Sequence, residues 1–255
     1  MMQEELPIAT LAAPACMREL YVGRHVTGTG TGPGPDAEPE PRSGPQVFHI
    51  RMANSARRRE AAGVLIRKMY GWRGYAVEPS LLHEPGKITL YAETGGAVVA
   101  TMSLCLDSPF LLPADENFGD MLDGLRAANR RLCEPSRLAI DRGMTKRVFA
   151  ALIHTSYLYA RVVHSCSDYV IEVNPRHVMF YQRMLGFEGF GAERPCTRVG
   201  APAVLLRLPL AQMGEQIRIW GGRIDQHGEE RSFYPYFFPA SDEPGITMRL
   251  RAGLT

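Results

Sequence analysis

The segment CEPSRLAI, residues 133–140, places a carboxylate, a hydroxyl and a guanidinium within four positions of an otherwise apolar stretch. Glu134, Ser136 and Arg137 are therefore the first side chains of this chain that could do chemistry. An ionised group removed from water is costly unless it is paired or hydrogen-bonded. The three residues indicate a catalytic site, a set of residues that positions other groups, or a buried pair that fixes the register of a strand.

Glu134 is the first candidate for a general base, because a carboxylate can take the proton of an amine directly or through water. In a regular strand Glu134 and Ser136 share one face and Arg137 points to the other. Pro135 cannot donate to the ladder, which predicts a β-bulge that re-aims these side chains and leaves a backbone amide for an oxyanion. Arg137 could bind a substrate carboxylate in a bidentate manner, or it could pair with Glu134.

Other polar side chains allow fewer roles. Asp107 follows a long predicted strand, where it could hold an amine or cap a turn. His154, His164 and His177 lack the spacing of a zinc motif, so we expect no metal. Ser136 has no neighbouring histidine in the sequence, which argues against a serine nucleophile.

The composition is that of a globular protein, with 255 residues, 45% hydrophobic and 22% charged residues, and a net charge of +2. Five cysteines at irregular spacings favour a reducing compartment. The acidic start MMQEEL is not typical of a secretory signal, and no apolar run is long enough to span a membrane. We expect a cytoplasmic protein without a transmembrane segment.

The chain divides at about residue 45. Residues 1–45 are predicted to be a disordered, Pro/Gly-rich leader, because the stretch from Thr27 to Pro45 has almost no apolar side chains. Residues 46–255 are predicted to form one domain with an aromatic-rich C-terminal segment. Hydrophobic periodicity predicts helices at about 55–70, 146–165 and 175–185. It predicts strands from about residue 46 and at 87–93, 97–106, 133–140, 168–174 and 203–208. This order describes an α/β or α+β fold with a mixed sheet and helices on both faces.

The stretch NPRHVMFYQRMLGFEGFG, residues 174–191, resembles the second acyl-donor motif of the GNAT acyltransferases. Asn174, Tyr181 and Gly186-Phe187 match its conserved types, although four residues separate Tyr181 from Gly186 where the superfamily usually has three. The other GNAT hallmark, a Gln/Arg-x-x-Gly-x-Gly/Ala turn that binds pyrophosphate through backbone amides, is absent from DRGMTKRV. A donor with a single phosphate, such as the phosphopantetheine arm of an acyl carrier protein, fits that absence.

CEPSRLAI resembles the Glu-x-Ser-Arg signature of the acylhomoserine lactone synthases, and residues 46–250 as a whole are most similar to the FeeM-type N-acyl amino acid synthases. Stretches such as VLIRKMYGWRGY and RVGAPAVLLRL carry that resemblance. It implies a GNAT-like, largely antiparallel sheet and acyl transfer from acyl carrier protein thioester to the α-amine of an amino acid, without a tightly bound cofactor. It also implies that Trp72, Arg73 and Tyr75 lie over the site.

Three alternatives stay open: an acylhomoserine lactone synthase, a coenzyme A dependent N-acetyltransferase, and an inactive GNAT-like module that binds acyl chains. The missing pyrophosphate turn argues against the second. The first matches poorly outside CEPSRLAI.

Between Arg126 and Arg147 the chain has seven basic and two acidic residues. Without a nucleic-acid motif we expect no nucleic acid partner. Because carrier proteins are acidic, we expect a docking surface for the carrier, although solvated helix ends are the alternative interpretation. The predicted docking residues are Arg126, Arg130, Arg131, Arg142, Lys146 and Arg147. The aromatic segment SFYPYFFPA, residues 232–240, is expected to fold back on the domain, closing an acyl tunnel or forming a dimer contact.

Overall fold

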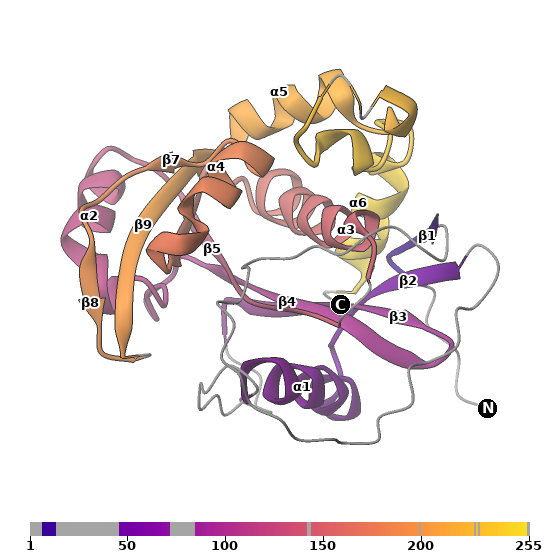
Figure 1. Cartoon of the computed structure of the whole chain (residues 1–255), viewed down its shortest axis with the longest axis horizontal. Helices are drawn as coiled ribbons and strands as arrows, with labels where there is room; N and C mark the ends of the chain where they lie inside the picture. Colours follow the sequence, from indigo (N-terminus) through magenta and orange to yellow (C-terminus); the bar gives the residue numbers. More distant parts are fainter. Residues whose placement is uncertain are drawn as a thin grey trace, which may run out of the picture.

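The computed structural model describes residues 7–13, 46–71, 85–141, 144–198, 200–226, 228 and 230–253. Nine strands from these ranges form a sheet in the order β1-β2-β3-β4-β5-β6-β9-β7, with β8 paired to β9 outside that path (Figure 1). The strands are β1 (Ala9–Ala13), β2 (Gln46–Met52), β3 (Lys87–Thr94), β4 (Ala97–Leu106), β5 (Leu132–Ile140), β6 (Asp168–Val173), β7 (Glu188–Gly189), β8 (Arg194–Cys196) and β9 (Ala201–Pro209).

Neighbouring strands run antiparallel with one exception in the middle of the sheet. β5 and β6 are parallel, and their pairing consists of Leu132 with Asp168 and Cys133 with Tyr169. After these two pairs the strands are no longer joined. Glu134, the next residue of β5, therefore lies where the sheet opens.

Helices cover both faces of the sheet. They are α1 (Ala56–Gly71), α2 (Asp115–Ala127), α3 (Lys146–Tyr157), α4 (Val178–Leu185), α5 (Leu210–Trp220) and α6 (Glu243–Ala252). Figure 1 shows α1 beneath the β3–β4 hairpin and α3 on the opposite face. A π-helix, η1 (Leu158–Val163), continues α3, and three short helices complete the chain, namely η2 (Pro175–His177), η3 (Ile224–Gln226) and η4 (Tyr234–Tyr236). This arrangement confirms the predicted mixed, largely antiparallel sheet.

The larger apolar core surrounds α3, whose residues from Val148 to Tyr157 are all buried. The C-terminal aromatic segment packs into this core, with the Phe233 ring 4.7 Å from that of Phe149. Tyr234 Oη donates to the carbonyl of Leu185 at 2.6 Å. Each buried aromatic side chain contributes about 2 kcal/mol of hydrophobic stabilisation. The expectation that this segment folds back on the domain is confirmed.

A second apolar core lies under α2. Phe118, Leu122 and Leu125 recur at helical spacing on its buried face and pack with side chains of β5, β6 and β9. The sequence analysis did not predict this helix, nor α5 and α6. The first turn of α2 lies beside Glu134, so this helix helps to build the candidate site.

One segment of the predicted leader is ordered. Residues 9–13 form β1, which pairs with β2 at the edge of the sheet, so the prediction of disorder is wrong for them. Arg249 Nε donates to the carbonyl of Ile8 at 2.7 Å, and Arg147 Nη1 donates to that of Ala12 at 2.8 Å. The sequence ATLAA is short and rich in small residues, so these tertiary hydrogen bonds, rather than strand propensity, hold it.

None of the helices in the described ranges is both long enough and apolar enough to cross a bilayer.

Candidate active site

Glu134 is a buried carboxyl with one backbone donor. Its side chain is 3% exposed, and its Oε2 accepts the N–H of Ala114 at 2.8 Å. Burial raises the pKa of Glu134 to about 8, and the carboxylates of Glu172 and Asp115 raise it further. The N–H of Ala114 and the guanidinium of Arg198 lower the pKa, but they do not offset the effect of burial. A carboxyl with this pKa exchanges its proton near neutral pH, as a general acid or base does.

A network of polar contacts surrounds Glu134. Arg198, in the turn between β8 and β9, donates to the carbonyl of Pro113 at 2.9 Å and pairs with the carboxylate of Glu172 on β6. Asn117 of α2 donates to the other oxygen of Glu172 at 3.3 Å. The network therefore joins β5, β6, α2 and the β8–β9 turn around the point where the sheet opens.

β5 contains a β-bulge, but it lies beyond the predicted place, because Glu134, Pro135 and Ser136 pair in regular register with Cys105, Leu104 and Ser103. Ser136 lies opposite Ser103 and Ala139 opposite Thr101, so two residues of β5, Arg137 and Leu138, face a single residue of β4. Arg137 has a φ of 50° there. This left-handed conformation is unfavourable for a residue with a side chain, by about 1–2 kcal/mol. The surrounding sheet thus holds Arg137 in a strained position, as is common for residues at functional sites.

Glu134 and Arg137 do not share the hydrogen bond that the sequence allowed. The carboxyl of Glu134 is bonded to the Ala114 amide instead. Ser136 and Arg137 are half-buried in the same stretch of β5. The catalytic roles of Ser136 and Arg137 stay predictions.

Asp107 and Arg126 belong to one cluster of ion pairs. Arg126 donates to both carboxylate oxygens of Asp107, at 2.8 and 2.9 Å, and to both of Asp115, at 2.7 Å each. It also contacts Asp123 at 2.8 Å. The Arg126 side chain is 22% exposed. Through these contacts Arg126 fastens α2 to the end of β4. The docking role of Arg126 and the amine-binding role of Asp107 stay predictions.

Asn174 and Tyr181 both lie in the stretch that resembles the acyl-donor motif. Asn174 Oδ1 accepts the N–H of Arg176 at 3.2 Å, and its Nδ2 donates to the carbonyl of Pro202 at 3.3 Å, so it caps the short helix η2. The Tyr181 ring packs edge-on against Phe187 and belongs to the periphery of the larger core. The roles of Asn174 and Tyr181 in binding the substrate stay predictions.

The other predicted docking residues differ in how far their charges are already engaged by contacts within the chain. Arg130 pairs with the fully buried Asp168 at 2.6 Å, and Arg147 bonds the backbone of β1. Arg131 and Lys146 are exposed, and the Lys146 ammonium lies 5.7 Å from the centre of the Tyr236 ring. Arg131 and Lys146 are therefore the strongest docking candidates. Four predicted site residues, Trp72, Arg73, Tyr75 and Arg142, lie outside the described residues.

The sequence analysis missed Glu172, Arg198 and Asn117. A glutamate in the apolar strand DYVIEV was a detectable signal for Glu172, of the same kind as that for Glu134. Arg198 and Asn117 lie in a turn and on a helix surface, where charged and polar side chains are common. No local pattern distinguishes them there.

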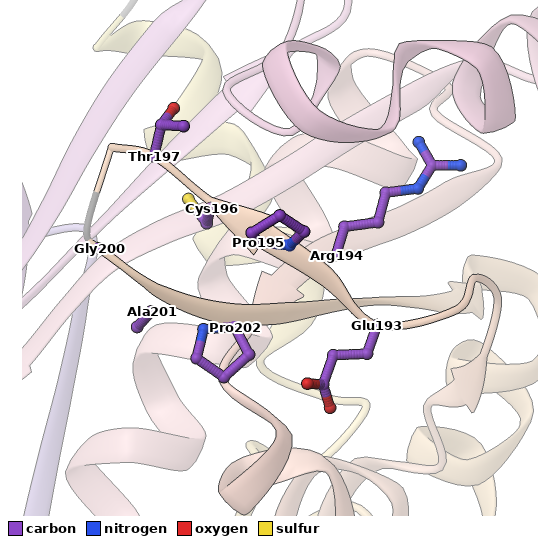
Figure 2. Close-up of a pocket in the computed structure, with 8 residues that line it drawn as sticks. All are labelled: Glu193, Arg194, Pro195, Cys196, Thr197, Gly200, Ala201 and Pro202. Atoms are coloured by element: carbon purple, nitrogen blue, oxygen red, sulfur yellow. The ribbon is translucent and has the colours of Figure 1, made fainter.

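Figure 2 shows the β8–β9 hairpin, from which Arg194 and Glu193 extend to opposite sides. A cavity of about 510 Å³ lies against this hairpin and is lined by residues 193–197 and 200–202. Arg194 contacts both carboxylate oxygens of Asp120 on α2, at 2.6 and 2.8 Å, which fixes the hairpin over that helix. In the part of the chain that the structure describes, no three His, Cys, Asp or Glu side chains are grouped to hold a metal ion.

Comparisons with known proteins identify the family of the chain. The family model described as N-acyl amino acid synthase FeeM matches residues 61–209, more than half of the chain. The solved structure of FeeM, an N-acyl amino acid synthase from uncultured soil microbes, is 27% identical with a TM-score of 0.60, and the match covers 66% of this chain and 93% of that chain.

Two further solved structures are more distant. The AHL synthase LasI is 15% identical with a TM-score of 0.44, over 64% of this chain and 90% of its own. An acyl-CoA N-acyltransferase from Pseudomonas aeruginosa is 12% identical with a TM-score of 0.44, over 63% and 97%. No curated protein sequence matches the chain. From the extent of the family match, the chain belongs to the N-acyl amino acid synthase FeeM family and is an N-acyltransferase with a GNAT-like fold.

Proposed function

We propose that this N-acyltransferase moves a fatty acyl chain from the phosphopantetheine thioester of an acyl carrier protein to the α-amine of an amino acid. The observation that carries the proposal is Glu134, a buried carboxyl with a pKa raised to about 8 at the point where β5 and β6 separate. An α-amino group titrates near the same pH, at about 8 in peptides. A proton can therefore pass between the two groups without a large free-energy difference.

The reaction requires one bond to form and one to break. The amine nitrogen attacks the thioester carbonyl carbon, and the C–N bond forms while the C–S bond breaks. Glu134 accepts the proton that the nitrogen loses, and the sulfur leaves as a thiolate that takes up a proton. Arg137, held in its strained position on the bulge, is proposed to bind the carboxylate of the amino acid, because a guanidinium can donate to both of its oxygens.

Two features support the carrier protein as donor. The sequence DRGMTKRV lacks the pyrophosphate-binding turn that coenzyme A would need. Arg131 and Lys146 are exposed basic residues at the beginnings of β5 and α3, where an acidic carrier can be attracted.

The test is a product assay with the purified full chain. Acyl carrier protein loaded with a fatty acyl chain is incubated with a mixture of amino acids, and N-acyl amino acids are detected by mass spectrometry; acyl coenzyme A replaces the carrier in a parallel reaction. We expect products with the carrier and few or none with coenzyme A. Equal activity with coenzyme A would refute the donor, and the absence of N-acyl amino acids with both donors would refute the proposed reaction.

A further inference from the structure

A single peptide group links Glu134 to Arg198. The N–H of Ala114 donates to Glu134 Oε2 at 2.8 Å, and the carbonyl of Pro113 accepts from Arg198 Nη1 at 2.9 Å. Both groups belong to the planar unit between Pro113 and Ala114, in which N–H and C=O point in opposite directions because the bond is trans. The carboxyl and the guanidinium thus lie at the two ends of one polarisable unit.

Arg198 is held at its end of this unit by the neighbouring elements. Its Nη2 pairs with Glu172, whose side chain is 5% exposed, and its Nη1 lies 3.6 Å from Glu116 on α2. Asn117 fixes the other oxygen of Glu172. A guanidinium with two carboxylate contacts and one carbonyl contact has little freedom to leave the Pro113 carbonyl, so its position relative to Glu134 is defined.

The charge of Arg198 acts on Glu134 in a known direction. A cation at the carbonyl end polarises the peptide and makes its N–H a stronger donor, which favours an ionised acceptor at the other end. Glu172 on β6 and Asp115 on α2 act in the opposite sense, and burial is the largest effect against ionisation. Arg198 and the Ala114 N–H are the groups that counter these three effects.

We propose that Arg198 is a positioning residue for Glu134, which acts through the Pro113–Ala114 peptide to hold the carboxyl in place and to favour its proton-accepting form. The proposal rests on the proposed function in that Glu134 takes the proton of the acceptor amine. Arg198 itself is not required to touch the substrate. Its effect on Glu134 can be measured without any acyl transfer.

The first test is the titration of Glu134 in the full chain, followed by NMR of isotope-labelled glutamate carboxyl carbons. The Glu134 signal is assigned by its loss in Glu134→Gln. In Arg198→Gln the midpoint should rise by roughly 0.5 to 1 pH unit, as expected for a cation removed at the distance of one peptide group. Arg198→Lys keeps the charge and should restore most of the midpoint.

Arg194→Gln is the matched control. Arg194 precedes the same turn, pairs with Asp120 and donates to the carbonyl of Asn117 at 2.8 Å, but it has no contact with Pro113 or Glu172 among the described residues. Its loss should leave the Glu134 midpoint unchanged. An unchanged midpoint in Arg198→Gln, or an equal shift in both variants, would overturn the proposal.

The second test is the pH dependence of acyl transfer. In Arg198→Gln the acidic limb should move to higher pH by the same amount as the titration, with roughly a three- to tenfold loss of rate at pH 7 that disappears above the new midpoint. A structural role alone would lower the rate equally at every pH. A moved titration midpoint without acyl transfer in the wild type would refute the proposed function and keep the coupling, whereas acyl transfer with both midpoints unmoved would refute the coupling alone.

Discussion

Replacement of Glu134 by glutamine should change how stability depends on pH. The pKa of Glu134 is raised from 4.5 to about 8 by burial, so the folded protein binds this proton more tightly than the unfolded chain does. The stabilisation that this carboxyl contributes is complete below the unfolded pKa and is lost as pH rises through the folded pKa. Glutamine keeps the shape and an oxygen for the Ala114 N–H, but it has no proton to lose.

The size of the effect follows from the difference between the two pKa values. At about 1.4 kcal/mol per unit, a shift from 4.5 to about 8 corresponds to as much as about 5 kcal/mol between pH 4 and pH 9. Urea unfolding at several pH values, followed by circular dichroism, gives the free energy of unfolding for the wild type and Glu134→Gln. Relative to the variant, the wild type should lose stability as pH rises from 5 to 9.

A glutamate on the surface provides the control for the substitution. Glu188 lies exposed on β7, and Glu188→Gln should follow the wild type at each pH. If Glu134→Gln also runs parallel to the wild type from pH 5 to pH 9, the carboxyl is not held in its neutral form by burial, and the reasoning about the site fails.

Three further predictions concern the elements around the site. Arg126→Gln leaves partly buried carboxylates without their cation, so the free energy of unfolding measured in urea should fall by about 2–3 kcal/mol. A loss under about 0.5 kcal/mol would contradict the assignment of a partly buried ion pair. Gly222→Ala places a Cβ 2.8 Å from Pro239 at a φ of +78° and should lower the melting temperature. Gly124→Ala, with open space around its Cβ in α2, should leave the melting temperature unchanged or raise it. Equal effects of the two substitutions would contradict the turn geometry at Gly222. The double variant Arg131→Glu and Lys146→Glu should raise the KM for the acylated carrier and weaken the dependence of that KM on salt. The KM for a small thioester mimic should change little. A carrier KM that neither charge reversal nor salt affects would exclude these residues from docking.

Much of the fold was predictable because its signals are local. The hairpin between β3 and β4 follows from Gly95 and Gly96, which both adopt positive φ, at 56° and 78°. The buried stripe of α3 follows from helical spacing. The proline in β5 predicted a bulge at Pro135, but the structure places the bulge at Arg137 and Leu138. The family resemblance rested on short motifs in these same elements.

The site was only partly predictable because its contacts are long-range. Glu134 was predicted because a charged side chain in an apolar strand is costly unless it is paired or has a function. Its hydrogen-bond donor, Ala114, lies 20 residues away at the beginning of a helix that was not predicted. Glu172 and Arg198 are 26 residues apart, and tertiary packing brings them together. Arg126 was assigned by counting charges, which cannot show that three carboxylates surround it.

The most direct measurement is the single-turnover rate of acyl transfer from acylated carrier protein to an amino acid, compared for the wild type and Glu134→Gln at pH 8. Both proteins should fold, and their circular dichroism spectra should agree. If Glu134 accepts the proton of the amine, the variant should be slower by roughly a hundredfold or more, as expected for the loss of a general base. A rate within a few-fold of the wild type would contradict the account and leave Glu134 as a structural carboxyl.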